Sequence, residues 1–121
     1  MNTRRALVLA ALGLAGLPVR AALSAIEAAR IERLIQYVEA QNQAKFVRNG
    51  TAYSCQEAAR FLRAKFDKMD EHVGTAAQFI DQIASRSSTS GQAYLIRFPD
   101  GRTVPAAQFI ADELRRIDKL P

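Results

Sequence analysis

The chain has 121 residues, with 17 lysines and arginines against 12 aspartates and glutamates, which gives a formal net charge of +5 at pH 7. This length fits one domain. A lone cysteine rules out an internal disulfide, and one histidine with one cysteine gives no recognised metal-ligand spacing. The sequence therefore predicts a fold held by packing alone, with no metal and no cofactor.

The first 21 residues have the organisation of a secretory signal peptide. Two arginines precede an uninterrupted apolar run at residues 6–17, and small side chains follow at positions 19 and 21. The apolar run is shorter than the ~20 residues that a membrane-spanning helix needs. We therefore predict export by cleavage after Ala21, or alternatively after Ala22 or Ala25, with no stable membrane insertion once the signal is removed.

Loss of this segment changes what the charge implies. Three of the 17 basic residues and none of the 12 acidic ones lie in it, so the net charge falls from +5 to +2. A surplus this small gives little support to a nucleic-acid ligand, and we expect none.

The remaining residues, 22–121, are predicted to form one domain that begins with a helix and a β-hairpin. Apolar side chains up to about residue 43 fall at helical spacing: Leu23, Ile26, Ile31, Leu34, Ile35 and Val38. Residues 45–48 and 51–53 then flank Asn49-Gly50, a pair that accepts the positive φ angles of a two-residue hairpin turn.

Two further helices have clear N-terminal signals. Ser54 is a predicted N-cap with Glu57 three residues later, which completes a capping box, and this helix continues to about Met69. Thr75 and Gln78 repeat the pattern at the start of the next helix. The apolar stripe of that helix consists of Phe79, Ile80 and Ile83.

The C-terminal third predicts two short strands and a final helix. Residues 93–98 alternate, with Tyr94, Ile96 and Phe98 on one face, and residues 102–104 return after a turn. Pro105 opens the last helix, where its missing N–H costs nothing. The predicted buried face of that helix is Ala107, Ile110, Leu114 and Ile117. Together the elements predict an α+β fold, with about four helices packed on a small antiparallel sheet and preceded by a cleaved signal peptide.

Several short motifs occur in an order and spacing that resemble a known family. They are residues 46–50, then 57–58 with Leu62 and Lys65, then 75–76 with 79–80, and finally 84–88 with Ser90-Gly91 and Tyr94. This pattern resembles the bacterial domain-of-unknown-function family 5329, small exported proteins of Gram-negative bacteria, over nearly the whole chain after residue 21. The resemblance implies a stand-alone periplasmic domain with no established activity or cofactor. Many members of that family have histidine where this chain has Phe61, and this departure argues against histidine chemistry on the helix.

Two loops hold the predicted binding surface: the tip of the hairpin and the serine-rich loop at residues 85–91, called the serine loop below. The predicted binding residues are Arg48, Asn49, Arg86, Ser88, Ser90 and Tyr94. Arg48 is explained either as a solvated charge or as an anion-binding fork. The loop hydroxyls bond either to their own backbone or to a glycan or peptide. We expect a non-enzymatic periplasmic module. Its expected partner is either an envelope protein or a cell-wall glycan in the form of a peptidoglycan fragment.

Two other functions remain open. An envelope enzyme is the first, because Cys55 lies at the first position of a helix, where a thiolate is favoured. The lone histidine, His72, follows the far end of that helix, so a Cys–His pair is geometrically poor and we assign no catalytic residue. A lysozyme-type inhibitor is the second, because Ser90-Gly91 with Tyr94 resembles a Ser-Gly-x-x-Tyr motif of periplasmic lysozyme inhibitors, although their barrel fold differs from the helical fold predicted here.

Overall fold

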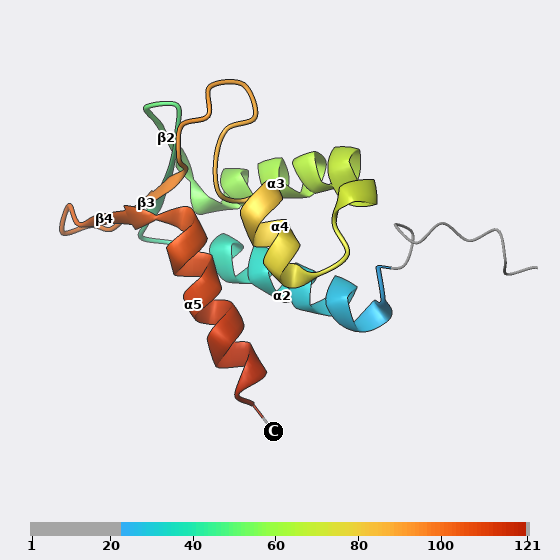
Figure 1. Ribbon diagram of the computed structural model, residues 1–121. Coiled ribbons are helices and arrows are strands. Elements are labelled where there is room, and N and C mark those ends of the chain that lie inside the picture. The colour runs from blue at the N-terminus through green and yellow to red at the C-terminus, as the bar shows by residue number, and fades with distance from the viewer. Residues whose placement is uncertain (1–22, 121) are drawn as a thin grey trace, which may run out of the picture.

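The computed structural model describes residues 23–120 (Figure 1). The predicted signal peptide, residues 1–21, lies outside the described residues. The described part contains four α-helices and one four-stranded antiparallel sheet, which confirms the predicted α+β class. The helices are α2 (Ala25–Glu39), α3 (Cys55–Met69), α4 (Ala76–Gln82) and α5 (Ala106–Asp118), and a 3-10 turn, η3 (Asp70–His72), follows α3.

The sheet joins two hairpins that are distant in the sequence. Its strands are β1 (Lys45–Arg48), β2 (Thr51–Ser54), β3 (Leu95–Arg97) and β4 (Thr103–Pro105), in the order β2-β1-β3-β4. The β1–β2 turn is Asn49-Gly50, with φ angles of 51° and 78°, as the dipeptide predicts. Phe46 pairs with Ile96 across the two central strands. Because strand side chains alternate, Arg48 extends on the same face of β1 as the buried Phe46.

The predicted cap of α3 is confirmed, and that of α4 differs in one bond. Ser54 Oγ accepts from Glu57 N at 3.0 Å and Glu57 Oε1 accepts from Ser54 N at 3.1 Å, which closes the capping box. Thr75 Oγ1 accepts from Gln78 N at 3.1 Å, but Gln78 Oε1 accepts from Gly74 N at 2.7 Å. In a complete capping box the Gln78 side chain would accept from the backbone N of Thr75. Here it accepts from the residue before, Gly74.

The first helix is shorter than predicted and buries fewer residues. It ends at Glu39 rather than near residue 43. Ile26, which was expected in the buried stripe, is 72% exposed, so that prediction is wrong. Five helical positions separate Ile26 from Ile31, which turns the two side chains about 140° apart around the helix axis. Ile31 is buried, and Ile26 consequently faces away from the core.

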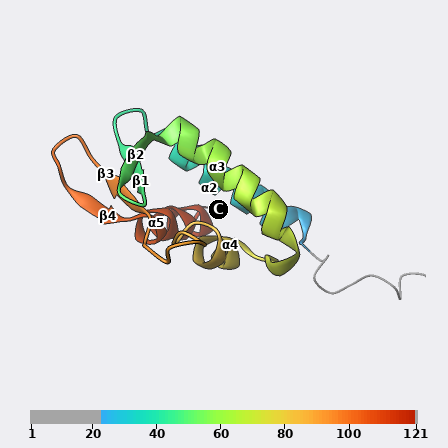
Figure 2. The ribbon, with the colours of Figure 1, turned by 90° about the horizontal axis from the view of Figure 1, so that it is seen from above.

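One apolar core lies between the helices and the sheet. Seen from above, the sheet is at one end, with α2 and α3 along one side and α4 and α5 along the other (Figure 2). The fully buried aromatic residues are Phe46, Phe79 and Tyr94, and Tyr94 and Ile96 confirm the face predicted from the alternation of β3. On α5, Ile110 and Ile117 are buried as predicted, whereas Ala106 and Glu113 are buried in place of Ala107 and Leu114, which are half-buried. No helix within residues 23–120 is long and apolar enough to cross a membrane.

Candidate functional site

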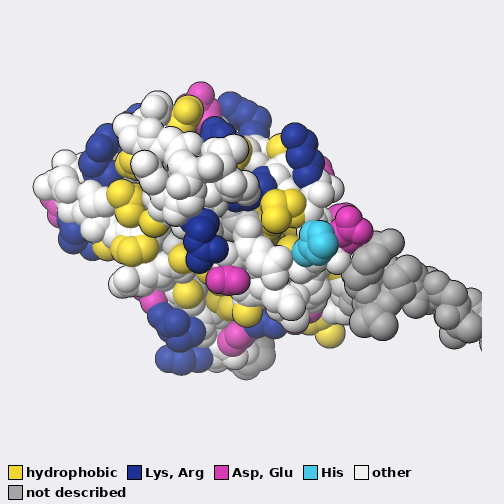
Figure 3. All heavy atoms as spheres, turned by 45° about the horizontal axis from the view of Figure 1, so that its top comes forward, with side chains coloured by type: hydrophobic (Ala, Val, Ile, Leu, Met, Phe, Trp, Pro, Cys, Tyr) yellow, Lys and Arg dark blue, Asp and Glu magenta, His cyan; other side chains and the backbone are white. Residues whose placement is uncertain are grey.

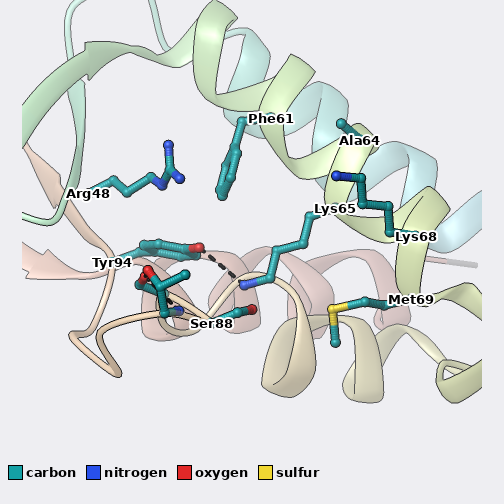
Figure 4. A pocket seen from close by; sticks show the side chains of 10 residues that line it. Arg48, Phe61, Ala64, Lys65, Lys68, Met69, Ser88 and Tyr94 are labelled. Atoms are coloured by element: carbon teal, nitrogen blue, oxygen red, sulfur yellow. Dashed lines mark hydrogen bonds between the residues drawn. The ribbon is translucent and has the colours of Figure 1, made fainter.

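A cavity of about 340 Å³ opens between α3, the end of β1 and the serine loop (Figure 4). Its basic residues are Arg48, Lys65 and Lys68. Its hydroxyl-bearing loop residues are Ser87, Ser88 and Thr89, and its aromatic and apolar walls are Phe61, Ala64, Met69 and Tyr94. Among residues 23–120, no aspartate or glutamate lines this space. We call it the cationic cavity.

Lys65 enters the cavity because it continues the buried stripe of α3. Ala58, Leu62 and Lys65 follow one another at spacings of four and three, so they share one helix face. The Lys65 side chain is only 9% exposed, and its Nζ donates to the carbonyl oxygen of Arg86 at 2.9 Å and to Tyr94 Oη at 3.1 Å. Burial lowers the pKa of Lys65 from its ordinary value of 10.5, and the nearby charges of Arg48 and Arg86 lower it further.

Tyr94 forms the floor of the cavity. Its ring is 1% exposed and lies 5.2 Å from the Phe46 ring and 5.7 Å from the Phe61 ring, measured between centroids. Burial raises the pKa of the Tyr94 phenol above its ordinary value, while the charge of Arg48 opposes that rise. The hydroxyl is therefore neutral near pH 7, and it accepts the hydrogen bond from Lys65.

Arg48 extends over the cavity rather than into open solvent. Its guanidinium carbon lies 4.3 Å from the centroid of the Phe61 ring, in cation–π geometry. Its Nε is buried and has no hydrogen-bond partner within the described part of the chain. This position follows from the two-residue period of β1, which places Arg48 on the core-facing side together with Phe46.

The serine loop is braced against the hairpin tip by side-chain hydrogen bonds. Ser90 Oγ donates to Asn49 Oδ1 at 2.5 Å, and Asn49 Nδ2 donates to Ser87 Oγ at 3.4 Å. Ser87 Oγ also accepts from the backbone N of Thr89 at 3.3 Å. Ser87 and Ser90 thus use their hydroxyls within the protein and fix one wall of the cavity.

The structure brings the six predicted binding residues near one another but gives them different positions. Arg48, Ser88 and Tyr94 line the cationic cavity. Asn49 and Ser90 are the bracing pair, and the exposed Arg86 contributes its carbonyl oxygen to Lys65. In the view with the top of the molecule brought forward, basic side chains are spread over this face with apolar side chains exposed between them (Figure 3).

The α3 helix contributes residues to this site that are absent from the predicted binding set. The helix supplies Phe61, Ala64, Lys65, Lys68 and Met69 to the cavity. Helical spacing was an available signal, because residues 61, 65 and 68 are four and three positions apart and so share one face. A lysine on the apolar stripe of a helix should have indicated a buried amine.

Cys55 does not have the environment that the enzyme alternative needs. The side chain is fully buried, and its Sγ lies 3.6 Å from the carbonyl oxygen of Ala44, to which it donates. Burial raises the pKa of the Cys55 thiol, which is the opposite direction from a reactive thiolate. In the part of the chain that the structure describes, no three side chains of His, Cys, Asp or Glu come together as a metal site requires.

Comparison with known proteins identifies the family. The sequence model of a family of unknown function, DUF5329, matches residues 25–118. The chain therefore belongs to this family, which confirms the resemblance seen in the motifs. One relative is the "Uncharacterized protein YfeK" of Salmonella typhimurium, 41% identical over 78 residues that cover 64% of this chain and 65% of that protein. The match thus spans less than two thirds of the relative, and no solved structure matches the chain.

Proposed function

We propose that this protein is exported to the periplasm and acts there as a non-enzymatic binding module for a peptidoglycan fragment. The observation that supports this proposal is the cationic cavity, in which three basic side chains meet no carboxylate from residues 23–120. Its volume of about 340 Å³ lies in the range of small-ligand sites. Cell-wall glycan strands and peptide stems carry carboxylate groups, which such a cavity would attract.

The export part of the proposal rests on the signal-like pattern at residues 1–21. The start of α2 favours a cut before Ser24, because Ser24 Oγ accepts from Glu27 N at 3.1 Å and so caps the helix. Cleavage after Ala21 or Ala22 keeps this cap, whereas cleavage after Ala25 removes it. N-terminal sequencing of protein from a periplasmic fraction should read from Ala22. Protein retained in the cytoplasm with residues 1–21 attached would disprove export.

An envelope protein is the second candidate partner, and the placement of the loops favours it. The hairpin tip and the serine loop rise together on one side of the molecule, joined by the Asn49–Ser90 hydrogen bond (Figure 1). Two braced loops beside a basic cavity suit a protein that inserts an acidic side chain. In this case the same cavity would bind the partner's carboxylate.

The test is a capture experiment from detergent-free envelope extract with tagged protein. The variant is Arg48→Ala, and the matched control is Arg102→Ala. Arg102 also stacks on a phenylalanine, since its guanidinium carbon lies 4.3 Å from the Phe98 ring, but it lies outside the cavity. Captured proteins and peptidoglycan fragments are both identified.

We expect fragments to be retained by the wild type and by Arg102→Ala and to be lost with Arg48→Ala. Capture of one protein by the wild type and Arg102→Ala, but not by Arg48→Ala, would favour an envelope protein as the partner. Equal retention by both variants would show that the cavity is not the binding site.

A further inference from the structure

We propose that the group bound in the cationic cavity is a carboxylate attached to a compact apolar body, rather than a phosphate. This inference rests on the proposed binding function and specifies the chemistry of the ligand. It follows from the arrangement of the basic side chains and the apolar character of the walls around them.

The two basic side chains beside Tyr94 come from opposite sides of the cavity. Arg48 reaches in from β1 and Lys65 from α3, with Tyr94 between them (Figure 4). Lys65 uses two of its three N–H groups on Arg86 and Tyr94, which leaves one without a partner among residues 23–120. Arg48 has a guanidinium whose forked N–H groups match the geometry of a carboxylate, and its buried Nε has no partner there. The two oxygens of one carboxylate accept from both side chains at once.

The walls determine what is attached to the carboxylate. Phe61, Ala64 and Met69 line the α3 side of the cavity, and the Tyr94 ring closes its floor. Apolar surface of this kind gains free energy when an apolar ligand body covers it. The preferred ligand therefore places its charged end between Arg48 and Lys65 and its apolar part along α3.

The same features disfavour a phosphate monoester. Its charge of nearly two must be desolvated beside apolar walls, and the penalty rises steeply with charge. Lys68 is exposed at the rim of the cavity, where solvent and salt screen its attraction for an anion, so it offsets little of this penalty.

The experiment is an NMR titration of isotope-labelled protein purified after expression of the full 121-residue chain. Four probes separate the contributions of the charge, the type of anion and the apolar body to binding. They are 3-phenylpropionate, its neutral amide, 2-phenylethyl phosphate, and acetate, which has the charge without the apolar body. We expect 3-phenylpropionate to shift the amide resonances of Phe61, Lys65 and Tyr94. It should bind at least about tenfold more tightly than the amide, because charge-assisted hydrogen bonds are lost with the carboxylate.

Two variants and one control locate the binding. Arg48→Ala and Lys65→Met should each weaken the binding of 3-phenylpropionate by about tenfold or more. Arg102→Ala should bind it with the same affinity as the wild type. Arg48 lies at a strand end and is partly exposed, so its variant tests the site even where Lys65→Met fails to fold. A phosphate ester that binds as tightly as the carboxylate, an amide that binds equally well, or no binding by any probe would each overturn the inference.

The result is independent of the capture experiment. If no probe binds but peptidoglycan fragments are still captured through Arg48, the ligand chemistry is wrong and the binding function stands. If 3-phenylpropionate binds through Arg48 and Lys65 while nothing is captured, the ligand chemistry stands and the proposed function fails.

Discussion

Two basic residues of α3, only two positions apart, are held in opposite ways. Arg63 faces α2, where its guanidinium lies 2.5 Å from a carboxylate oxygen of Glu32 and 3.7 Å from one of Glu39. Lys65 points about 200° away around the helix, and its partners among residues 23–120 are neutral acceptors, a carbonyl and a phenol. Within this part of the chain, the charge of Arg63 therefore meets carboxylates and the charge of Lys65 does not.

Two arginines on other helices follow the pattern of Arg63. Arg30 bonds to Glu27 at 2.7 Å and to Asp118 at 2.7 Å, which ties α2 to α5. Arg116 pairs with the buried Glu113 on α5. In both contacts the charge of the arginine meets a carboxylate. A buried amine without one costs free energy, and such a cost is typical of a site kept for a ligand.

The largest effect is expected at the floor of the cavity. Tyr94→Ala should lower the free energy of unfolding by about 3–5 kcal/mol, because it removes a buried aromatic ring. Tyr94→Phe keeps the ring and loses the acceptor for Lys65, and should cost about 1 kcal/mol. Urea denaturation measures both. If the alanine variant were as stable as the phenylalanine variant, packing beneath the cations would not matter.

The second effect is a pH dependence that should distinguish Lys65 from Arg63. The pKa of Lys65 is lower in the folded state than its ordinary 10.5, so the unfolded chain binds more protons between the two values. The contribution of Lys65 to the free energy of unfolding should therefore rise as the pH increases from the folded-state pKa toward 10.5, as the buried charge is lost.

Lys65→Met supplies the reference for this measurement. Burial raises the pKa values of Cys55 and Tyr94, which adds an opposite slope above about pH 9 in both proteins. The wild type should thus gain stability relative to Lys65→Met as the pH rises. Parallel curves for the two proteins would show that the amine is not desolvated.

The third effect concerns the carboxylate that joins α2 to α4. Glu27 Oε1 accepts from Ala76 N at 2.8 Å, and Oε2 accepts from Arg30 at 2.7 Å. These bonds, led by the one from Ala76, depress the pKa of Glu27 below its ordinary 4.5. Glu27→Gln should therefore cost about 1 kcal/mol above pH 4.5, and the difference should fade as the pH drops through the folded pKa. A difference that persists in strong acid would point to packing instead.

The smallest effect on stability is expected on the face of α3 where Arg63 has carboxylate partners. Arg63→Ala should cost about 0.2–1 kcal/mol, because the ion pairs with Glu32 and Glu39 are partly exposed. Added salt should reduce this cost further. Thermal unfolding at low and high ionic strength checks it, and a large cost independent of salt would mean that Arg63 acts through its aliphatic stem.

Local signals predicted most of the fold. The capping box at Ser54 and Glu57 marked the start of α3, and Asn49-Gly50 marked the hairpin turn. Both depend on residues within four positions of one another, so the sequence shows them directly. The error at Ile26 has a local cause as well, because five helical positions place Ile26 about 140° around the axis from the buried Ile31.

The cavity needed contacts that cross the chain. Lys65 and Tyr94 are 29 residues apart, and Asn49 and Ser90 are 41 apart. Both loops were predicted as binding surface from their residue types, but α3 was absent from the prediction. No local sequence pattern predicts which helix packs over the core-facing side of β1.

The sequence by itself determined the class of fold, the capping box of α3, the hairpin and the serine loop, because each follows from backbone preferences and spacing over a few residues. Only the tertiary structure decided that Arg48 and Lys65 line one cavity with no carboxylate from residues 23–120 in its walls, while Arg63 meets two. Which charges are balanced depends on which elements pack together. That packing is set by burial of the whole apolar core, to which every element contributes.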